Sequence, residues 1–366
     1  MKLLFDYEIF SVQKYGGATR YFYELISRFV NYEDLDVILN MGLHINRYKL
    51  EDFSSRYYTF KGIRIPHIPK TKLLLIKLQK PFFEKFERKT DYDIFHQTYY
   101  ADYPKRSDKK RIITVHDFTH EKLPGYFGML DKTIIAKEKA VYNADGIICI
   151  SENTKKDLID LYDVNESKIS VIYHGNSLNY EVSKTPFFDK PYILNVGDRR
   201  AYKSFRLLVE AFANSEELKQ NFHIFCFGGG RFSDKEIELF KGYSIFGKVH
   251  QSEGSDEMLA ISYKNASVFV YPSLYEGFGI PLLEAMHYGC PVVASNSSSF
   301  PEIGGDAVEY FEPGNADDLE DKITLVLNDT DRRRALIKSG YEREKLFSWD
   351  RCANDTYNFY NFIFNG

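Results

Sequence analysis

Residues 271–295 read YPSLYEGFGIPLLEAMHYGCPVVAS and contain the clearest succession of strand, loop and helix in the chain. An apolar run predicts a strand that ends at Pro272, and Pro281 suits the first turn of the helix that follows. Between them, Gly277 and Gly279 allow the backbone to approach a ligand closely. The free amides and the dipole at the start of a helix favour a bound phosphate. The stretch therefore predicts a phosphate-binding loop at the end of a strand, in a sheet covered by helices.

The same alternation of short apolar runs and helical patterns extends along the whole chain, which is typical of parallel sheets. The polar stretch 176–191 contains two prolines, has no clear periodicity and divides the alternation into two series. We predict strands at 2–5, 37–39, 94–96, 112–115, 146–150, 169–173, 192–196, 223–227, 248–250, 268–271 and 291–294. We therefore expect an α/β protein of two doubly wound, Rossmann-like domains, 1–180 and 181–349, with the ligand in a cleft between them at the carboxyl ends of the strands.

Length and composition fit this architecture. A chain of 366 residues with 44% hydrophobic and 27% charged residues is typical of a globular protein of two or three domains. The net charge of −4 argues against a nucleic-acid-binding protein. The four cysteines are far apart, which predicts reduced core residues. Asp6 and Glu8 interrupt the first apolar run, so no signal peptide is expected, and no apolar run is long enough to span a membrane. We expect a cytoplasmic protein.

Charge is unevenly distributed along the chain. Residues 1–180 contain 28 Lys+Arg and 24 Asp+Glu, a balance of +4, and residues 181–366 contain 20 and 28, a balance of −8. The basic excess concentrates at 70–89, where lysines alternate with leucines and phenylalanines. Two interpretations of this segment stay open. It is either an interfacial segment on anionic lipid, which would place the protein on the inner face of the cytoplasmic membrane, or a solvated basic face over a core stripe, broken at Pro81.

Two carboxylates flank the glycine loop. Glu276 precedes Gly277, and Glu284 lies about one turn into the predicted helix. An ionised carboxylate can accept hydrogen bonds from two neighbouring hydroxyls, as the acidic residue of dinucleotide-binding folds does for ribose. We therefore expect Glu284 to hold a ribose and Glu276 to face the same ligand.

The segment 276–292 resembles the E-x7-E signature of the retaining glycosyltransferases of family 4 (glycosyl transferases group 1), which have the GT-B fold. Further resemblance lies in the N-terminal glycine loop YGGATRY, the His-Asp loop VHD, the segment ISENT and the phosphate-binding loop NVGDRRAYK, at 15–21, 115–117, 150–154 and 195–203. A later glycine turn at 227–230 matches as well. On these motifs the chain is identified as a member of that family, similar to bacterial mannosyltransferase-type enzymes that build surface polysaccharide.

The resemblance implies transfer of a sugar from a nucleotide-diphosphate donor to an acceptor hydroxyl, with retention of the anomeric configuration and with no metal or other cofactor. Positive side chains must then stabilise the leaving diphosphate. Lys203 carries over directly. The family's arginine follows the loop glycine, where this sequence has Asp198, so its role falls to Arg199 or Arg200, and we prefer Arg199. The residues expected to contact the donor are Gly16, Gly17, Gly229, Gly277, Phe278, Gly279, Ile280 and Glu284, with His116, Glu276, Arg199 and Lys203 in catalytic roles.

The first domain is expected to receive the acceptor. Gly16 and Gly17 separate a predicted strand from a helix, where a backbone wall beside the ligands and a tight turn are compatible roles. By resemblance, His116 contacts the transferred sugar or orients the acceptor. His96 resembles a frequent family position near the cleft, and a structural role is the favoured of its two interpretations. By analogy with the family, the last helix, 350–366, crosses back to pack on the first domain.

The motifs leave the substrates open. The similarity to mannosyltransferase-type enzymes favours a GDP-linked sugar such as GDP-mannose, and a saccharide or lipid-linked saccharide acceptor in surface-polysaccharide or O-antigen synthesis. A UDP- or dTDP-sugar donor remains an alternative. Two other classes are a sugar-nucleotide epimerase, which would need no acceptor, and a non-catalytic sugar-nucleotide binder. No carboxylate can be assigned as a covalent nucleophile.

Overall fold

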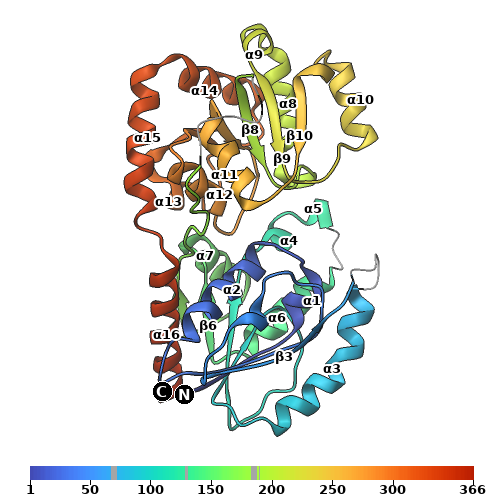
Figure 1. The fold of residues 1–366 in the computed structure, drawn as a ribbon, viewed down its shortest axis with the longest axis vertical. Helices are drawn as coiled ribbons and strands as arrows, with labels where there is room; N and C mark the ends of the chain where they lie inside the picture. Colours follow the sequence, from blue (N-terminus) through green and yellow to red (C-terminus); the bar gives the residue numbers. More distant parts are fainter. Residues whose placement is uncertain (67–71, 128–130, 183–187, 189) are drawn as a thin grey trace. The chain divides into compact units, whose positions relative to one another are not determined.

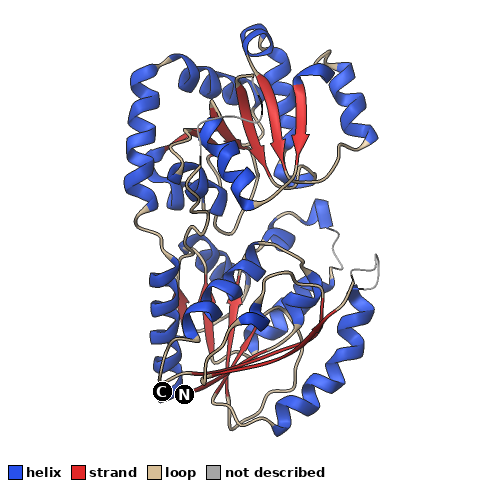
Figure 2. Cartoon of the chain, viewed as in Figure 1, coloured by secondary structure: helices blue, strands red, loops and turns tan. Residues whose placement is uncertain are grey.

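The computed structural model describes residues 1–66, 72–127, 131–182, 188 and 190–366 (Figure 1). The chain forms two compact units: Met1–His174 with Trp349–Gly366, and Gly175–Ser348. The division at 174/175 lies beside the boundary expected near 180. Residues 183–187 and 189 of the predicted linker lie outside the described residues. Each unit is an α/β domain with helices packed around a central sheet (Figure 2).

The first unit contains a seven-stranded sheet in which every pairing is parallel, with the order β3-β2-β1-β4-β5-β6-β7. The central strands are buried on both faces, which is why the sequence shows them as continuous apolar runs. The bounds are β1 (Lys2–Phe5), β2 (Asp36–His44), β3 (Tyr58–Arg64), β4 (Ile94–Gln97), β5 (Lys110–Val115), β6 (Gly146–Cys149) and β7 (Ile169–Val171). The helices are α1 (Glu8–Val12), α2 (Gly17–Phe29), α3 (Lys72–Lys89), α4 (Thr119–Lys122), α5 (Pro124–Phe127), α6 (Lys132–Tyr142) and α7 (Glu152–Leu161).

The last helix, α16 (Trp349–Asn365), belongs to this first unit and packs beside α2 (Figure 1). The hydroxyl of Tyr360 lies 2.5 Å from Nδ1 of His96, and Nε of Arg28 donates to Asp350 at 2.6 Å. A Cβ at Gly146 would lie 2.9 Å from Ile363, so the close approach of α16 requires glycine there. The predicted crossing of the terminal helix is therefore confirmed.

The second unit contains a six-stranded parallel sheet with the order β10-β9-β8-β11-β12-β13. Its strands are β8 (Tyr192–Val196), β9 (His223–Phe227), β10 (Val249–Ser252), β11 (Val268–Tyr271), β12 (Val292–Ser295) and β13 (Val308–Phe311). The helices are α8 (Phe205–Asn214), α9 (Glu216–Asn221), α10 (Asp234–Gly242), α11 (Asp256–Asn265), α12 (Ile280–His287), α13 (Phe300–Gly304), α14 (Ala316–Asn328) and α15 (Thr330–Glu344). The α8 and α14 side chains share one apolar core with the sheet.

Four elements of the structure differ from those expected from the sequence. Strands β3 and β13 were not predicted, and β2 extends well beyond 37–39, through a register shift between Asn40 and Gly42. The predicted break at Pro81 is wrong, because α3 continues through this residue from Lys72 to Lys89. A proline inside a helix removes one backbone hydrogen bond, and here the packing of the helix on the domain core outweighs that cost.

Candidate active site

The best-defined site lies in the second unit, where the order of the strands reverses between β8 and β11. In open parallel sheets this is the place where a crevice forms at the carboxyl ends of the strands. The loop after β8 leads to Lys203, and the loop after β11 carries Glu276. Two sequence motifs 73 residues apart therefore meet at one point of the fold.

Lys203 and Glu276 form an ion pair with 2.5 Å between Nζ and Oε1. Both side chains are mostly buried, with 23% and 14% of their surface exposed. Burial alone would lower the pKa of Lys203, but the Glu276 carboxylate and the neighbouring Tyr202 outweigh it and raise the pKa above its ordinary value. The lysine therefore carries a positive charge at neutral pH, at a place where an anionic leaving group could share it.

Serine side chains hold the loop that carries Glu276. The amide of Glu276 donates to Oγ of Ser298 at 3.0 Å, and Oγ of Ser299 donates to the carbonyls of Glu276 and Phe278 at 3.0 and 2.7 Å. Ser295 donates to the carbonyl of Ser273 at 2.5 Å. These serines were not among the site residues predicted from the sequence. The run of serines directly after the predicted strand at 291–294 was the available signal, because serines at strand ends commonly bond to nearby backbone.

The glycine loop leads into helix α12 as predicted from the sequence. Gly279 is the N-cap, with φ at 111°, and Pro281 occupies the first turn. A side chain at Gly279 would be strained by this left-handed conformation, and its Cβ would also crowd Leu282 and Phe300 at 3.3 Å. The backbone from Gly277 to Ile280 is therefore the entry to a helix whose first amides can bind an anion.

Glu284 lies on the buried side of α12, with 5% of its surface exposed. Its Oε2 accepts a hydrogen bond from the hydroxyl of Tyr263 at 3.0 Å. Burial raises the pKa of Tyr271 well above its ordinary value, and the carboxylates of Glu276 and Glu284 raise it further. Both glutamates thus lie close enough to Tyr271 to act on the same phenol, and their contact with one ligand stays a prediction.

Arg199 is buried and makes several hydrogen bonds to other residues of the second unit. Its guanidinium donates to Glu236 at 2.8 Å and to the carbonyls of Gly228 and Gly230, both at 2.9 Å. It thereby holds the glycine turn after β9. Gly229 in this turn has φ of +73°, and a Cβ there would lie 2.5 Å from the carbonyl oxygen of Gly197. These contacts describe a positioning residue, and direct contact of Arg199 with a diphosphate stays a prediction.

Arg200, the other candidate, is an exposed residue. Its guanidinium forms a bidentate ion pair with Asp198. Nε donates to Oδ1 at 2.9 Å and Nη2 donates to Oδ2 at 2.6 Å. The side chain of Arg200 is 85% exposed. The structure therefore separates the two neighbouring arginines into one that supports the loop from inside and one that lies on the surface.

In the first unit, His116 follows β5 and is held by surrounding groups. Its amide donates to the hydroxyl of Tyr100 at 3.1 Å, while Nζ of Lys137 donates to the carbonyl of Asp117 at 2.7 Å. Nε2 of His116 is buried and has no hydrogen-bond partner among the described residues. Burial lowers the pKa of His116 to about 4, with Lys137 acting in the same direction and Asp117 opposing. The ring is therefore a neutral donor or acceptor at physiological pH.

The glycines at the start of α2 have different surroundings. A Cβ at Gly16 would meet the side chain of Gln13 at 2.4 Å, whereas a Cβ at Gly17 would have no atom of a described residue within 4 Å. The chain's own packing thus gives no reason for glycine at 17, and close approach of a ligand remains the predicted reason. His96 is fully buried with both ring nitrogens bonded, to Tyr360 and to Thr114, which is the structural role expected for it.

Comparison with known families covers both units. The family model described as Glycosyltransferase Family 4 matches residues 15–179, and the model described as Glycosyl transferases group 1 matches residues 179–343. The chain is a family 4 glycosyltransferase. The resemblance read from the E-x7-E and glycine-loop motifs is confirmed.

The relatives of this glycosyltransferase include two enzymes named O-antigen chain mannosyltransferases. The chain is 28% identical over 271 residues to the O-antigen chain mannosyltransferase B of Escherichia coli, which covers 70% of this chain and 71% of the relative. It is 28% identical to the O-antigen chain mannosyltransferase RfbU of Salmonella typhimurium, over 56% of this chain and 57% of the relative.

Solved structures share the fold of the glycosyltransferase over nearly its whole length. Sucrose-phosphate synthase from Thermosynechococcus elongatus has a TM-score of 0.80 at 23% identity, covering 100% of this chain and 99% of the other. WaaG, a glycosyltransferase of lipopolysaccharide biosynthesis, has a TM-score of 0.71 at 17% identity, with 94% and 95% coverage. The predicted GT-B fold of two Rossmann-like domains is therefore confirmed.

The predicted site residues of the glycosyltransferase fall into two groups. Gly16, Gly17 and His116 belong to the first unit. The second unit brings Lys203 and Glu276 together. It also places Glu284 close to Tyr271, the tyrosine that Glu276 approaches. Within the described residues, no group of three or more His, Cys, Asp or Glu side chains is arranged to hold a metal ion.

Proposed function

We propose that this glycosyltransferase moves mannose, with retention of configuration and without a metal ion, from GDP-mannose to a saccharide or lipid-linked saccharide of a surface polysaccharide such as O-antigen. The observation that carries the proposal is the similarity to two bacterial enzymes named O-antigen chain mannosyltransferases, one of them matched over about 70% of both chains. The polar groups of the second unit support the nucleotide-diphosphate part of the proposal.

The site chemistry follows from the geometry described above. On donor binding, the Lys203 ammonium would be shared between Glu276 and the diphosphate, and the amides at the start of α12 would add a second positive pole. A carboxylate can accept about four hydrogen bonds, so the bond from Tyr263 to Glu284 is compatible with further bonds from two ribose hydroxyls. As the carbon–oxygen bond to the diphosphate breaks, these groups stabilise the developing negative charge.

A UDP-sugar donor is the second candidate for the same reaction. It is favoured by a solved structure of Anabaena HepE in complex with UDP and glucose, which has a TM-score of 0.70 over 99% of both chains at 15% identity. At that identity the likeness shows the fold alone, so we rank UDP below GDP.

A thermal-shift panel of GDP, UDP, dTDP and ADP tests the donor base. A nucleotide present at about 100 times its dissociation constant adds about 2.7 kcal/mol of stability, which raises the melting temperature measurably. We expect GDP to give the largest shift. Stabilisation by UDP alone would contradict the GDP assignment and leave the transferase assignment intact.

Incubation with the sugar nucleotide alone separates the enzyme from its rivals. A transferase releases free sugar slowly when water replaces the acceptor. An epimerase would instead convert the donor to a second sugar nucleotide, and a non-catalytic binder would leave it unchanged. Product analysis by chromatography distinguishes the three outcomes, with a Glu276→Gln variant as the inactive control.

We also propose that the first unit contacts anionic lipid through helix α3. On one face of this helix, Leu74, Leu78 and Phe82 are 57%, 59% and 76% exposed. Leu78 and Phe82 continue into an apolar groove of about 550 Å³ that also includes Ile63 of β3, itself 66% exposed. Apolar side chains at this helical spacing, flanked by the exposed Lys77 and Lys85, suit the interface of an anionic membrane. Residues 70 and 71 of the predicted segment lie outside the described residues.

No helix in the described part of the chain combines the length and apolarity needed to cross a bilayer, so the proposed contact is peripheral. Vesicle sedimentation tests it. We expect Lys77→Glu/Lys85→Glu and Leu78→Ser/Phe82→Ser variants to bind phosphatidylglycerol-containing vesicles less than wild type. Lys80 is left unchanged, because its Nζ donates to the carbonyl of Asp102 at 2.6 Å. Unchanged sedimentation of both variants would favour the solvated-face interpretation.

A further inference from the structure

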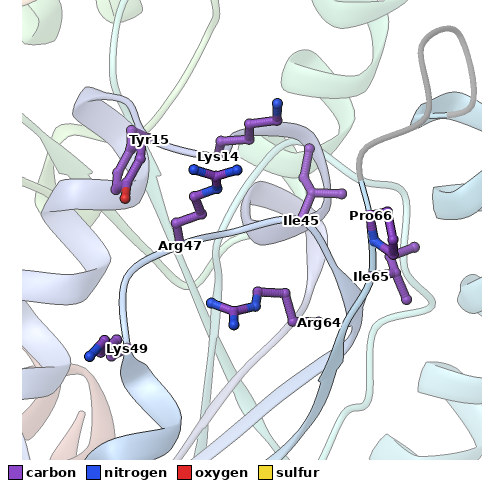
Figure 3. Close-up of a pocket in the computed structure, with 8 residues that line it drawn as sticks. All are labelled: Lys14, Tyr15, Ile45, Arg47, Lys49, Arg64, Ile65 and Pro66. Atoms are coloured by element: carbon purple, nitrogen blue, oxygen red, sulfur yellow. The ribbon is translucent and has the colours of Figure 1, made fainter. Parts of the chain in front are cut away.

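A hollow of about 680 Å³ opens at the carboxyl ends of β2 and β3 in the first unit (Figure 3). Its cationic side chains come from three separate segments: the loop before α2, the segment after β2 and the end of β3. They are Lys14, Arg47, Lys49 and Arg64, and no carboxylate is among the lining residues. We name this hollow the basic pocket.

The described residues do not neutralise the positive charge of the basic pocket. None of its four cations forms an ion pair within 4.0 Å with a described residue. The nearest acidic residues in sequence, Glu51 and Asp52, are exposed and likewise form no ion pair with them. Four like charges around one space repel one another, and an anion bound between them relieves that repulsion.

A buried asparagine fixes the spacing of the cations. Asn46 has no exposed surface, and its Nδ2 donates to the carbonyls of Gln13 and Lys14 at 3.2 and 3.3 Å. Its Oδ1 accepts from the amide of Tyr48 at 3.0 Å, and the amide of Arg47 donates to the carbonyl of Lys14 at 3.1 Å. The loop before α2 and the segment after β2 are thereby tied together. The backbone around the pocket is therefore held by hydrogen bonds of the fold, and the pocket is more than a cluster of surface lysines.

The chemistry of the lining selects phosphate. The planar guanidinium groups of Arg47 and Arg64 match phosphate oxygens two at a time, and the lysines add point charges. The volume lies within the range of small-molecule sites. Tyr15 at the rim is 60% exposed and rests edge-on against Tyr48 at 5.4 Å, so it offers an apolar face beside the charged groups. An anion with more than one negative charge, attached to a larger group, fits these features.

We propose that the basic pocket binds the phosphate or diphosphate group of the acceptor. The inference rests on the proposed function, because it treats the first unit as the acceptor side. Lys14 and Tyr15 directly precede Gly16 and Gly17, so the pocket adjoins the loop where the acceptor is expected. The acceptor is thus a saccharide joined to a phosphate or diphosphate, and Arg47 and Arg64 bind this negatively charged group.

Calorimetry with inorganic pyrophosphate tests the pocket directly. The nucleotide site is first filled with a saturating nucleoside diphosphate, so that pyrophosphate reports on the first unit. We expect binding by wild type and by Lys132→Gln, which removes an exposed cation from α6, and a dissociation constant raised at least about 30-fold in Arg47→Gln/Arg64→Gln. Equal binding by the double variant, or no binding by wild type, would overturn the proposal.

Two further measurements identify the source of the phosphate. With acceptors that carry or lack the phosphate, we expect the double variant to raise KM about tenfold or more for the phosphorylated acceptor alone, with donor hydrolysis unchanged. Wild type that hydrolyses no donor would count against the proposed function and not against the pocket. If the double variant keeps pyrophosphate binding and loses only its binding to phosphatidylglycerol vesicles, the pocket reads lipid headgroups and the acceptor assignment is wrong.

Discussion

Lys203 and Glu276 belong to loops at the ends of different strands, yet their charged atoms lie 2.5 Å apart. The pair occupies the switch point of the second sheet. Each side chain neutralises the charge of the other, so a substitution at either position leaves the remaining side chain without its ion-pair partner. The ion pair therefore links the phosphate-binding loop to the carboxylate expected to face the sugar.

Replacing Lys203 by alanine should lower kcat/KM by about 30- to 1000-fold, because losing charge-assisted hydrogen bonds to the diphosphate costs roughly 2–4 kcal/mol. Added magnesium should not restore activity, as the proposed reaction uses protein cations. Steady-state kinetics with and without magnesium measure both effects. Arg200→Ala, at an exposed neighbour, is the matched control, and rescue of Lys203→Ala by magnesium would contradict the metal-independent reaction.

Glu284→Ala should cost a similar factor, about 30- to 1000-fold in kcat/KM, through loss of two hydrogen bonds to ribose. The Tyr263→Phe variant removes only the hydroxyl that bonds to Oε2, and should retain most of the activity. A Glu284→Ala enzyme within about threefold of wild type would refute the ribose assignment.

Arg199→Ala should destabilise the protein by about 2–3 kcal/mol, because it leaves Glu236 and two partly buried carbonyls without their donor. Arg200→Ala should change the stability by less than about 1 kcal/mol, since its pair with Asp198 is exposed. Urea unfolding of the whole chain followed by far-ultraviolet circular dichroism compares the two variants. If Arg199→Ala keeps its stability but loses nucleotide binding, Arg199 is a phosphate ligand and not a positioning residue.

Asp6 and Glu8 predict a dependence of stability on pH. Asp6 has no exposed surface and Glu8 has 4%, and burial raises the pKa of both carboxyls. The fold therefore prefers their neutral forms. Because the folded pKa values exceed the unfolded ones of about 4, stability should fall as pH rises through the folded values.

The Asp6→Asn variant keeps the size of the side chain and removes its charge. Its melting temperature relative to wild type should rise progressively between about pH 5 and pH 9. Asp160→Asn, on the surface of α7, controls for the loss of one negative charge. A difference that shrinks with rising pH would show that Asp6 is ionised in the folded protein.

His116 should remain neutral across the physiological range, because its pKa is lowered to about 4 by burial. Its ring resonances, assigned by comparison with a His116→Asn variant, should show no titration between about pH 6 and pH 8. An inflection near the ordinary value of about 6.5 would mean that the ring is solvated.

Most of the strands that were predicted correctly are buried on both faces and so form continuous apolar runs, as in β1 and β11. Strand β3 lies at the sheet edge and is largely exposed, so its sequence lacks such a run. It was missed for that reason, and with it the contribution of Arg64 to the basic pocket.

Site residues could be predicted where all the residues of a structural feature lie within one short sequence motif. The Gly277–Ile280 backbone and the helix start at Pro281 belong to a single segment, and local chemistry determined them. The role of Arg199 depends on Glu236, which lies 37 residues away, and Asn46 depends on carbonyls 32 and 33 residues away. Contacts of this kind arise only when the sheet brings distant loops together.

Helix α16 has a consequence for synthesis of the chain. Trp349 and Tyr360 are buried in the first unit, where Tyr360 contacts His96, although they are translated after the whole of the second unit. Domains commonly fold in the order in which they leave the ribosome. Here the second unit, continuous from Gly175 to Ser348, can finish first, whereas the first must wait for α16. A chain released early would therefore leave the ribosome with its N-terminal core still open.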